Sequence, residues 1–70
     1  MYSLSDFKIA VVGLGYVGLP LALALARKFP NVIGFDVSAK KVSLLKEGKD
    51  PNREGYDSEI HQSNLKVSCD

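Results

Sequence analysis

Short and long apolar segments follow one another along this chain, separated by glycine-rich or polar stretches, and this order predicts alternating strands and helices. A short β-branched run over residues 8–12 leads into a glycine-rich turn, and an almost continuous apolar segment then extends to Ala26. A second short apolar run covers residues 32–35, and a weaker amphipathic segment covers residues 39–47. Short apolar runs bounded by glycine, proline or asparagine are typical of buried strands, whereas the longer segments are typical of helices.

The predicted order of elements is β-α-β-α-loop-β, with a short third helix inside the loop. We expect strands at about 8–12, 32–35 and 65–68, and helices at about 16–28, 39–47 and 57–63. The first helix is apolar on nearly every face, so we expect it to be largely buried. Arg27 and Lys28 complement the dipole at its end, and Pro30 stops it. Ser38 is a good N-cap for the second helix, and Gly48 should end it.

The connections between parallel strands determine the layers of the fold. Right-handed crossovers place both long helices on one face of a sheet with strand order 3-2-1. Parallel sheets are covered on both faces, and a doubly wound sheet places a fourth strand beside the first. Nothing in these 70 residues supplies either feature. We therefore expect residues 1–70 to be the N-terminal β-α-β-α-β portion of a larger α/β fold, a doubly wound parallel sheet of the Rossmann type.

A G-x-G-x-x-G motif lies between the first strand and the first helix, which is the context that a dinucleotide fingerprint requires. Gly13 lets the chain turn off the strand, Gly15 leaves room for a pyrophosphate, and Gly18 lets helix and strand approach closely. Free N–H groups and the helix dipole then favour phosphate. Tyr16 and Val17, inside the motif, are further cofactor-binding candidates. The Tyr16 side chain either contacts the phosphates or packs over the turn.

An acidic residue completes the fingerprint at the end of the second strand. Asp36 lies 18 residues after Gly18 and 23 after Gly13. This is close to the roughly 20-residue spacing at which a carboxylate reaches the adenosine ribose hydroxyls. Together the strand, turn, helix, second strand and Asp36 predict nucleotide binding. The alternative is a turn that serves only packing, with Asp36 as a helix cap, but it gives no reason for Gly15.

Composition and charge narrow the classes of partner. Nine basic against eight acidic residues argue against nucleic acid or an anionic membrane. The longest apolar run, residues 17–26, is too short for a bilayer, which requires about 20 residues, and it lacks the features of a signal peptide. A single cysteine, Cys69, excludes an internal disulfide framework and fits a reducing compartment. We therefore expect a cytoplasmic protein.

Two longer stretches carry a resemblance to a known family. KIAVVGLGYVGLPLALALA and VIGFDVSAKKVSLLKEG resemble the amino terminus of the UDP-glucose/GDP-mannose dehydrogenase family, and within it the bacterial UDP-N-acetylglucosamine and UDP-N-acetylgalactosamine 6-dehydrogenases. The string G-L-G-Y-V-G-L-P is more specific than the general fingerprint, because Tyr16, Leu19 and Pro20 are not required for nucleotide binding as such. The resemblance covers residues 8–70.

The second half of the chain resembles the same family more loosely. Asp50, Asn52 and Glu54 match a D-x-N-x-E loop of that subgroup. The family often carries an arginine near the cofactor ribose where this chain has Lys41, so the resemblance makes Lys41 a cofactor-binding candidate. A lysine supplies positive charge there but lacks the bidentate fork of arginine.

The resemblance implies what the complete protein does. Members oxidise the primary alcohol of a nucleotide sugar to a uronic acid in polysaccharide biosynthesis, reducing two NAD and using a cysteine nucleophile that holds the intermediate. It also implies a UDP-sugar bound by domains outside this chain, and a homo-oligomer at full length. The alternatives are a non-catalytic dinucleotide-sensing regulatory domain and another NAD-dependent dehydrogenase.

No catalytic or metal-binding residue is expected within the 70 residues themselves. In the family the catalytic cysteine lies far beyond residue 70, and a small cysteine at a strand end, such as Cys69, more often fills space. His61 has no second histidine or cysteine at ligand spacing, so we do not expect it to bind a metal. The chain by itself is therefore expected to be inactive.

Overall fold

The computed structural model describes residue 3 and residues 6–70, which form a three-stranded parallel sheet with helices. The strands are β1 (Ile9–Val12), β2 (Val32–Phe35) and β3 (Lys66–Ser68), and the helices are α1 (Gly18–Lys28), α2 (Ala39–Lys46) and α3 (Asp57–Gln62). The sheet has the order β1-β2-β3, so the central strand is β2. All six predicted elements are present, and their ends differ from the expected ones by at most two residues.

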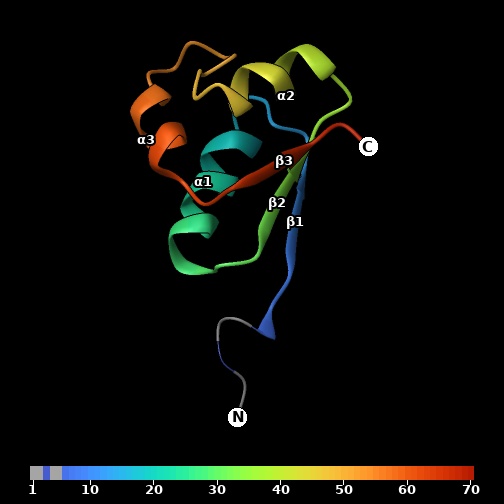
Figure 1. Cartoon of the computed structure of the whole chain (residues 1–70), viewed down its shortest axis with the longest axis vertical. Helices are drawn as coiled ribbons and strands as arrows, with labels where there is room; N and C mark the ends of the chain where they lie inside the picture. The colour runs from blue at the N-terminus through green and yellow to red at the C-terminus, as the bar shows by residue number, and fades with distance from the viewer. Residues whose placement is uncertain (1–2, 4–5) are drawn as a thin grey trace.

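The three strands run in the same direction, and their carboxyl ends meet at one edge of the sheet (Figure 1). Val12 pairs with Phe35 at the end of β1, and Phe35 pairs with Ser68 of β3. The pairing continues just beyond the strands, because the Gly13 N–H donates to the Phe35 carbonyl at 2.7 Å and the Asp36 N–H donates to the Ser68 carbonyl at 3.1 Å. The glycine turn and Asp36 therefore start from the same edge.

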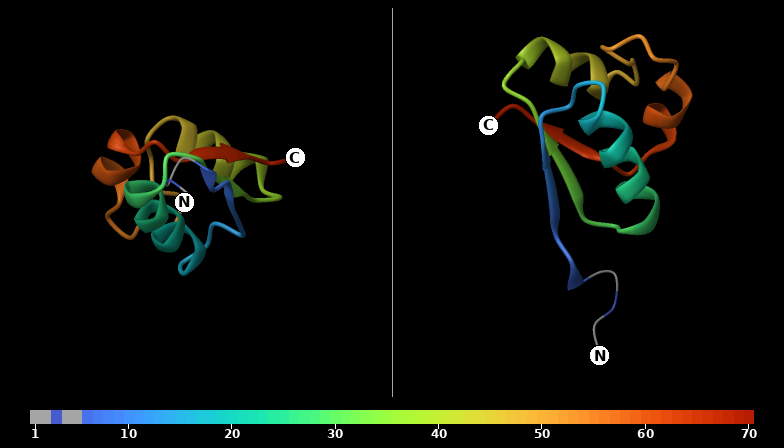
Figure 2. Two further views of the ribbon diagram at one scale, coloured as in Figure 1. Left: turned by 90° about the horizontal axis from the view of Figure 1, so that it is seen from below. Right: turned by 180° about the vertical axis from the view of Figure 1, so that it is seen from behind.

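The helices lie on one side of the sheet, as the right-handed crossovers predict (Figures 1 and 2). Side chains of β1 and β2 alternate accordingly: Val11 and Val32 are buried beneath the helices, whereas Val12, on the opposite face, is 83% exposed. Ile33 and Phe35 share that opposite face and are only half-buried. Within the described residues this apolar face of the sheet has no covering layer.

The expectation that α1 is largely buried is wrong. Its buried residues lie on one face and are Leu19, Ala22, Leu23 and Ala26. Leu21 is 50% exposed and Ala24 is exposed. An apolar sequence on all sides of a helix requires neighbours on all sides for full burial. Here the sheet and the other helices contact α1 from one side only.

The helix ends follow the predicted chemistry. The Ser38 hydroxyl accepts a hydrogen bond from the Lys41 N–H at 3.2 Å, so Ser38 is the N-cap of α2. Gly48 follows the end of α2 with φ of 80°, a left-handed conformation that favours glycine. Helix α1 ends with Arg27 and Lys28 in its last turn, and Arg27 forms an ion pair with Glu59 of α3.

The glycine turn is attached to the core by Leu14. This side chain is completely buried and packs with a cluster that includes Val11, Leu19 and Leu23. Gly34 of β2 makes room for it, since a Cβ at position 34 would lie 2.7 Å from Leu14 Cδ2. The sequence analysis assigned no role to either residue. The leucine between the first two glycines therefore holds the turn in place.

Candidate nucleotide-binding site

A hollow of about 470 Å³ lies at the carboxyl ends of the three strands. Its lining residues are Val12, Gly13, Phe35, Asp36, Val37, Cys69 and Asp70. The crevice outside the carboxyl ends of the strands is where open α/β sheets bind ligands. Two of the predicted site residues, Gly13 and Asp36, thus share one wall of this hollow.

The three motif glycines differ in what requires glycine at each position. Gly13 has φ of 90°, which a residue with a side chain rarely adopts. A Cβ at Gly18 would overlap with the carbonyl oxygen of Gly13, so the predicted close approach of helix and strand is confirmed. A Cβ at Gly15 would meet nothing within 4 Å. No packing contact in the described part of the chain therefore requires glycine at position 15, which is where the packing-only alternative is weakest.

Several hydrogen-bond donors of the glycine turn remain available. Within the described residues, the backbone N–H groups of Gly15, Tyr16 and Val17 donate to no protein atom. These groups precede α1, whose dipole favours an anion at this end. The side chains of Tyr16 and Val17 are 67% and 81% exposed, so Tyr16 does not pack over the turn. The turn therefore offers three successive free N–H donors to a ligand.

Asp36 links the glycine turn to the start of α2. Its Oδ2 accepts a hydrogen bond from the Leu14 N–H and its Oδ1 accepts one from the Ser38 N–H, each at 2.9 Å. These two bonds, that from Leu14 first, lower the pKa of Asp36 below its ordinary value of 3.8. Lys41 adds a smaller attraction in the same direction, against a desolvation effect that raises the pKa. The carboxylate is therefore charged at neutral pH.

The alternative reading of Asp36 as a helix cap is not what the structure shows, because Ser38 caps α2. A carboxylate has about four acceptor positions, and the protein uses two of those on Asp36. Lys41 Nζ lies 3.9 Å from Asp36 Oδ2, with 36% of the Lys41 side chain exposed. Asp36 and Lys41 thus form a neighbouring acceptor and cation beside the glycine turn.

Three further residues lie at the site although the sequence did not predict them there. The Asn52 side chain donates from Nδ2 to the Leu14 carbonyl at 3.1 Å, although the two residues are 38 positions apart. Cys69 and Asp70 line the hollow because they directly follow β3. In the sequence, only the match of Asn52 to the D-x-N-x-E loop pointed to a role for Asn52. The place of Cys69 and Asp70 after a predicted third parallel strand could have located them at the hollow, because ligands bind at the carboxyl ends of such strands.

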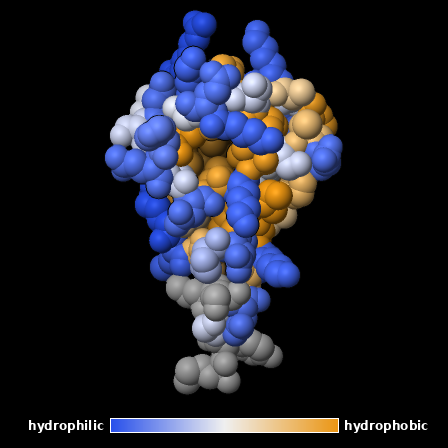
Figure 3. Space-filling view, viewed as in Figure 1, coloured by the Kyte–Doolittle hydropathy of each residue, from blue (hydrophilic) through white to orange (hydrophobic). Residues whose placement is uncertain are grey.

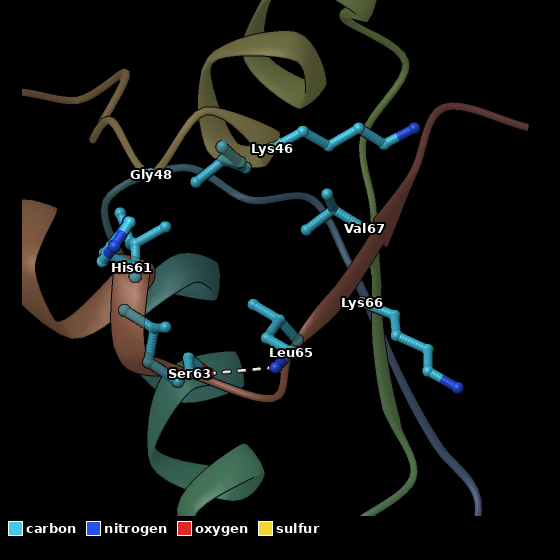
Figure 4. A pocket seen from close by; sticks show the side chains of 10 residues that line it. Lys46, Gly48, His61, Ser63, Leu65, Lys66 and Val67 are labelled. Carbon is cyan, nitrogen blue, oxygen red and sulfur yellow. Dashed lines mark hydrogen bonds between the residues drawn. The ribbon is translucent and has the colours of Figure 1, made fainter.

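A second hollow, of about 510 Å³, lies between the helices and β3 (Figures 3 and 4). Apolar side chains line its interior, including Leu23, Leu45 and Leu65. None of the predicted cofactor-binding residues lies there. His61 is at its edge, with Nδ1 3.0 Å from the point that a Cβ on Gly48 would occupy. Neither this hollow nor any other described part of the chain has three His, Cys, Asp or Glu side chains grouped to hold a metal ion.

Comparison with known proteins gives one family. Residues 7–69 match the model of the UDP-glucose/GDP-mannose dehydrogenase family, NAD binding domain. A UDP-N-acetyl-D-glucosamine 6-dehydrogenase of Salmonella typhi is 44% identical over 63 residues, which are 90% of this chain and 15% of that protein. The chain thus spans about one seventh of the length of this relative.

Solved structures agree with the sequence comparison. A GDP-mannose dehydrogenase of Pseudomonas aeruginosa, in a ternary complex, has a TM-score of 0.79 and 35% identity, over 91% of this chain and 16% of that one. A UDP-D-ManNAc dehydrogenase of Pyrococcus horikoshii has a TM-score of 0.81 and 30% identity over the same shares of the two chains. These relatives are named as dehydrogenases, so the comparisons do not favour a non-catalytic regulatory domain. Among the described residues, no helix is both long and apolar enough to cross a membrane.

Proposed function

Because this chain belongs to the UDP-glucose/GDP-mannose dehydrogenase family and matches its NAD binding domain, we propose that it is the first part of that domain in a nucleotide-sugar 6-dehydrogenase. The complete protein oxidises the primary alcohol of a UDP-N-acetylhexosamine to a carboxylate in polysaccharide biosynthesis. The substrate class is taken from the names of the relatives. The single observation that carries the proposal is the hollow at the strand ends, where the glycine turn and Asp36 meet.

Residues at this hollow and in the adjoining glycine turn would hold a dinucleotide. The free N–H groups of Gly15, Tyr16 and Val17 would hold the pyrophosphate, in the space that a side chain on Gly15 would fill. Asp36 would accept hydrogen bonds from the adenosine ribose with its two unused acceptor positions. NAD, when bound, supplies the hydride acceptor for the oxidation.

Further residues would complete the cofactor site. Lys41, beside Asp36, would add positive charge near the ribose. Gly13 and Gly18 would contribute by shaping the turn, Gly13 through its positive φ and Gly18 through the close approach to the Gly13 carbonyl. Cys69 is an exposed free thiol, which fits the proposed reducing cytoplasm. The catalytic residues, the UDP-sugar-binding domain and the contacts of a homo-oligomer would then come from the remainder of the complete protein, because this chain spans only 15% of its relative from Salmonella typhi.

The test is the stoichiometry of the reaction catalysed by the full-length protein. UDP-N-acetylglucosamine, GDP-mannose and a small hydroxyacid are offered separately with NAD, and NADH is counted by absorbance. Two NADH per UDP-sugar are expected, because an alcohol must pass through an aldehyde to reach a carboxylate. One NADH per substrate, or turnover with the hydroxyacid alone, would indicate another dehydrogenase. NAD binding without any turnover would favour the regulatory alternative.

A further inference from the structure

Leu14, between the first two motif glycines, is held by hydrogen bonds to both of its backbone polar groups, which belong to two successive peptide units, Gly13–Leu14 and Leu14–Gly15. The Leu14 N–H donates to Asp36, and the Leu14 carbonyl accepts a hydrogen bond from the Asn52 side chain at 3.1 Å. A trans peptide is planar, so the carbonyl of Leu14 and the N–H of Gly15 point in opposite directions. Because Asn52 holds the Leu14 carbonyl, the Gly15 N–H points away from the loop that contains Asn52. One side chain thus sets the direction of a donor that no protein atom in the described chain accepts.

The loop that presents Asn52 is built around a buried carboxylate. Asp50 is only 7% exposed, and it accepts hydrogen bonds from the backbone N–H groups of Asn52 at 2.8 Å, Glu54 at 2.8 Å and Tyr56 at 3.3 Å. Arg53 is held at φ of 54°, a conformation that non-glycine residues rarely adopt. Tyr56 packs against the hydrophobic core. The loop is therefore held at both ends, so the Asn52 side chain has a fixed place.

We propose that Asn52 is a positioning residue for the cofactor, acting on the pyrophosphate through the Leu14–Gly15 peptide. This inference rests on the proposed function, in which the glycine turn binds that pyrophosphate. Without the Asn52 amide the half-enclosed Leu14 carbonyl loses its partner, and the peptide is free to tilt. The Gly15 donor then loses its direction. Ligands with a pyrophosphate should be affected, and ligands without one should not.

The test compares three ligands on the full-length protein. Asn52→Ala should weaken binding of NAD and of ADP-ribose by about five- to tenfold, which is the size expected for the loss of one hydrogen bond. Binding of adenosine, which has no phosphate, should stay within about twofold of the wild type by the same reasoning. Asn64→Ala is the matched control, because Asn64 is exposed and precedes β3 at the opposite edge of the sheet. It should leave all three affinities unchanged.

A second variant separates hydrogen bonding from loss of packing. Asn52→Asp keeps the shape of the side chain, but its carboxylate has no donor for the Leu14 carbonyl. At pH 7 it should bind ADP-ribose at least as weakly as Asn52→Ala. As the pH falls towards about 4 the protonated carboxyl regains an O–H donor, so the ratio to the wild-type affinity should narrow. Asn52→Ala has no such group, and its ratio should remain constant.

Two results would overturn this role of Asn52. One is Asn52→Ala binding NAD and ADP-ribose within twofold of the wild type. The other is an equal loss of affinity for adenosine, which would mean that the substitution damages the whole fold. A wild-type protein that binds neither NAD nor ADP-ribose would contradict the proposed function itself, and with it the role of Asn52.

Discussion

At the scale of single residues, Asp36 combines two backbone hydrogen bonds with an ion pair to Lys41. Its carboxylate accepts hydrogen bonds from the N–H groups of Leu14 in the glycine turn and of Ser38 at the start of α2, so it connects these two segments. The same two hydrogen bonds lower its pKa and keep it charged. A carboxylate of the protein at the adenosine ribose discriminates between the two cofactors, because it accepts hydrogen bonds from the hydroxyls of NAD and repels the 2′-phosphate of NADP.

The full-length protein should therefore prefer NAD to NADP. Hydrogen bonds to a charged group contribute about 1.5–3 kcal/mol, so Asp36→Ala should weaken NAD about ten- to a hundredfold. It should also remove the repulsion of a 2′-phosphate and leave Lys41, 3.9 Å away, free to attract it. Titration of both cofactors against wild type, Asp36→Ala and Asp36→Ala/Lys41→Ala measures each effect. Equal wild-type affinity for the two cofactors would remove Asp36 from the ribose site.

Stability should also depend on pH through Asp36. Its pKa is lowered in the folded protein, so its contribution to stability is present above the unfolded pKa of about 3.9. That contribution is lost as the pH falls through the lower folded value. The difference in melting temperature between wild type and Asp36→Asn should therefore be constant at neutral pH and shrink below about pH 4. A difference that grows on acidification would contradict the direction of the shift.

At the scale of elements, the glycine turn combines residues that serve the fold with residues that serve the ligand. Gly13 and Gly18 are required by backbone conformation and by the approach of α1 to β1. Leu14 attaches the turn to the core, and Gly34 on the neighbouring strand makes room for it. Gly13 and Gly15 both face open space, but only Gly15 has neither a positive φ nor a close neighbour that requires glycine. Substitutions within one motif should therefore have different consequences.

Gly15→Val should abolish cofactor binding while the protein stays folded, because a Cβ at position 15 meets no protein atom within 4 Å and the side chain would occupy ligand space. Gly18→Val should in addition destabilise the fold, by about 1–3 kcal/mol, because its Cβ would overlap with the Gly13 backbone. Circular dichroism melts and NAD titration of both variants separate the two effects. Tight NAD binding by Gly15→Val would show that the glycine turn is only structural.

At the scale of the whole molecule, the sheet is covered on one face and bare on the other. Val12, Ile33 and Phe35 leave an apolar surface that parallel sheets normally bury. Among the described residues, the hollow at the strand ends is lined only by the last residues of β1 and β2 and by residues that come just after β1, β2 and β3. We therefore propose that the described residues supply one side of a cofactor site, and that the rest of that site and the sugar-binding surface come from the remainder of the complete protein.

Residues 1–70 by themselves should show no dehydrogenase activity. The described chain has one thiol, Cys69, and it lies exposed at the wall of the proposed cofactor site. NADH formation is measured with the isolated chain and the full-length protein at equal concentration, each with NAD and UDP-N-acetylglucosamine. Turnover should appear with the full-length protein alone. Turnover by the isolated chain would make Cys69 the first residue to substitute.

The sequence by itself determined the elements, their order and the main part of the candidate site. These depend on local chemistry: β-branched runs form strands, Ser38 and Gly48 delimit a helix, and a glycine motif at a set distance from Asp36 needs no knowledge of packing. Strand order followed from the handedness of crossovers. The burial of α1 did not follow, because apolar composition shows what a helix would bury and not how many neighbours it has.

Only the tertiary structure decided the contacts between distant parts of the chain. Asn52 reaches Leu14 across 38 residues, Gly34 makes room for Leu14, and Cys69 comes to the wall of the hollow beside Asp36. Each contact depends on how loops and strands far apart in the sequence are brought together by the packing of one core. Periodicity and spacing report on neighbours along the chain, so they cannot specify such pairs. The nucleotide fingerprint could be predicted, and the residues that hold it in place could not.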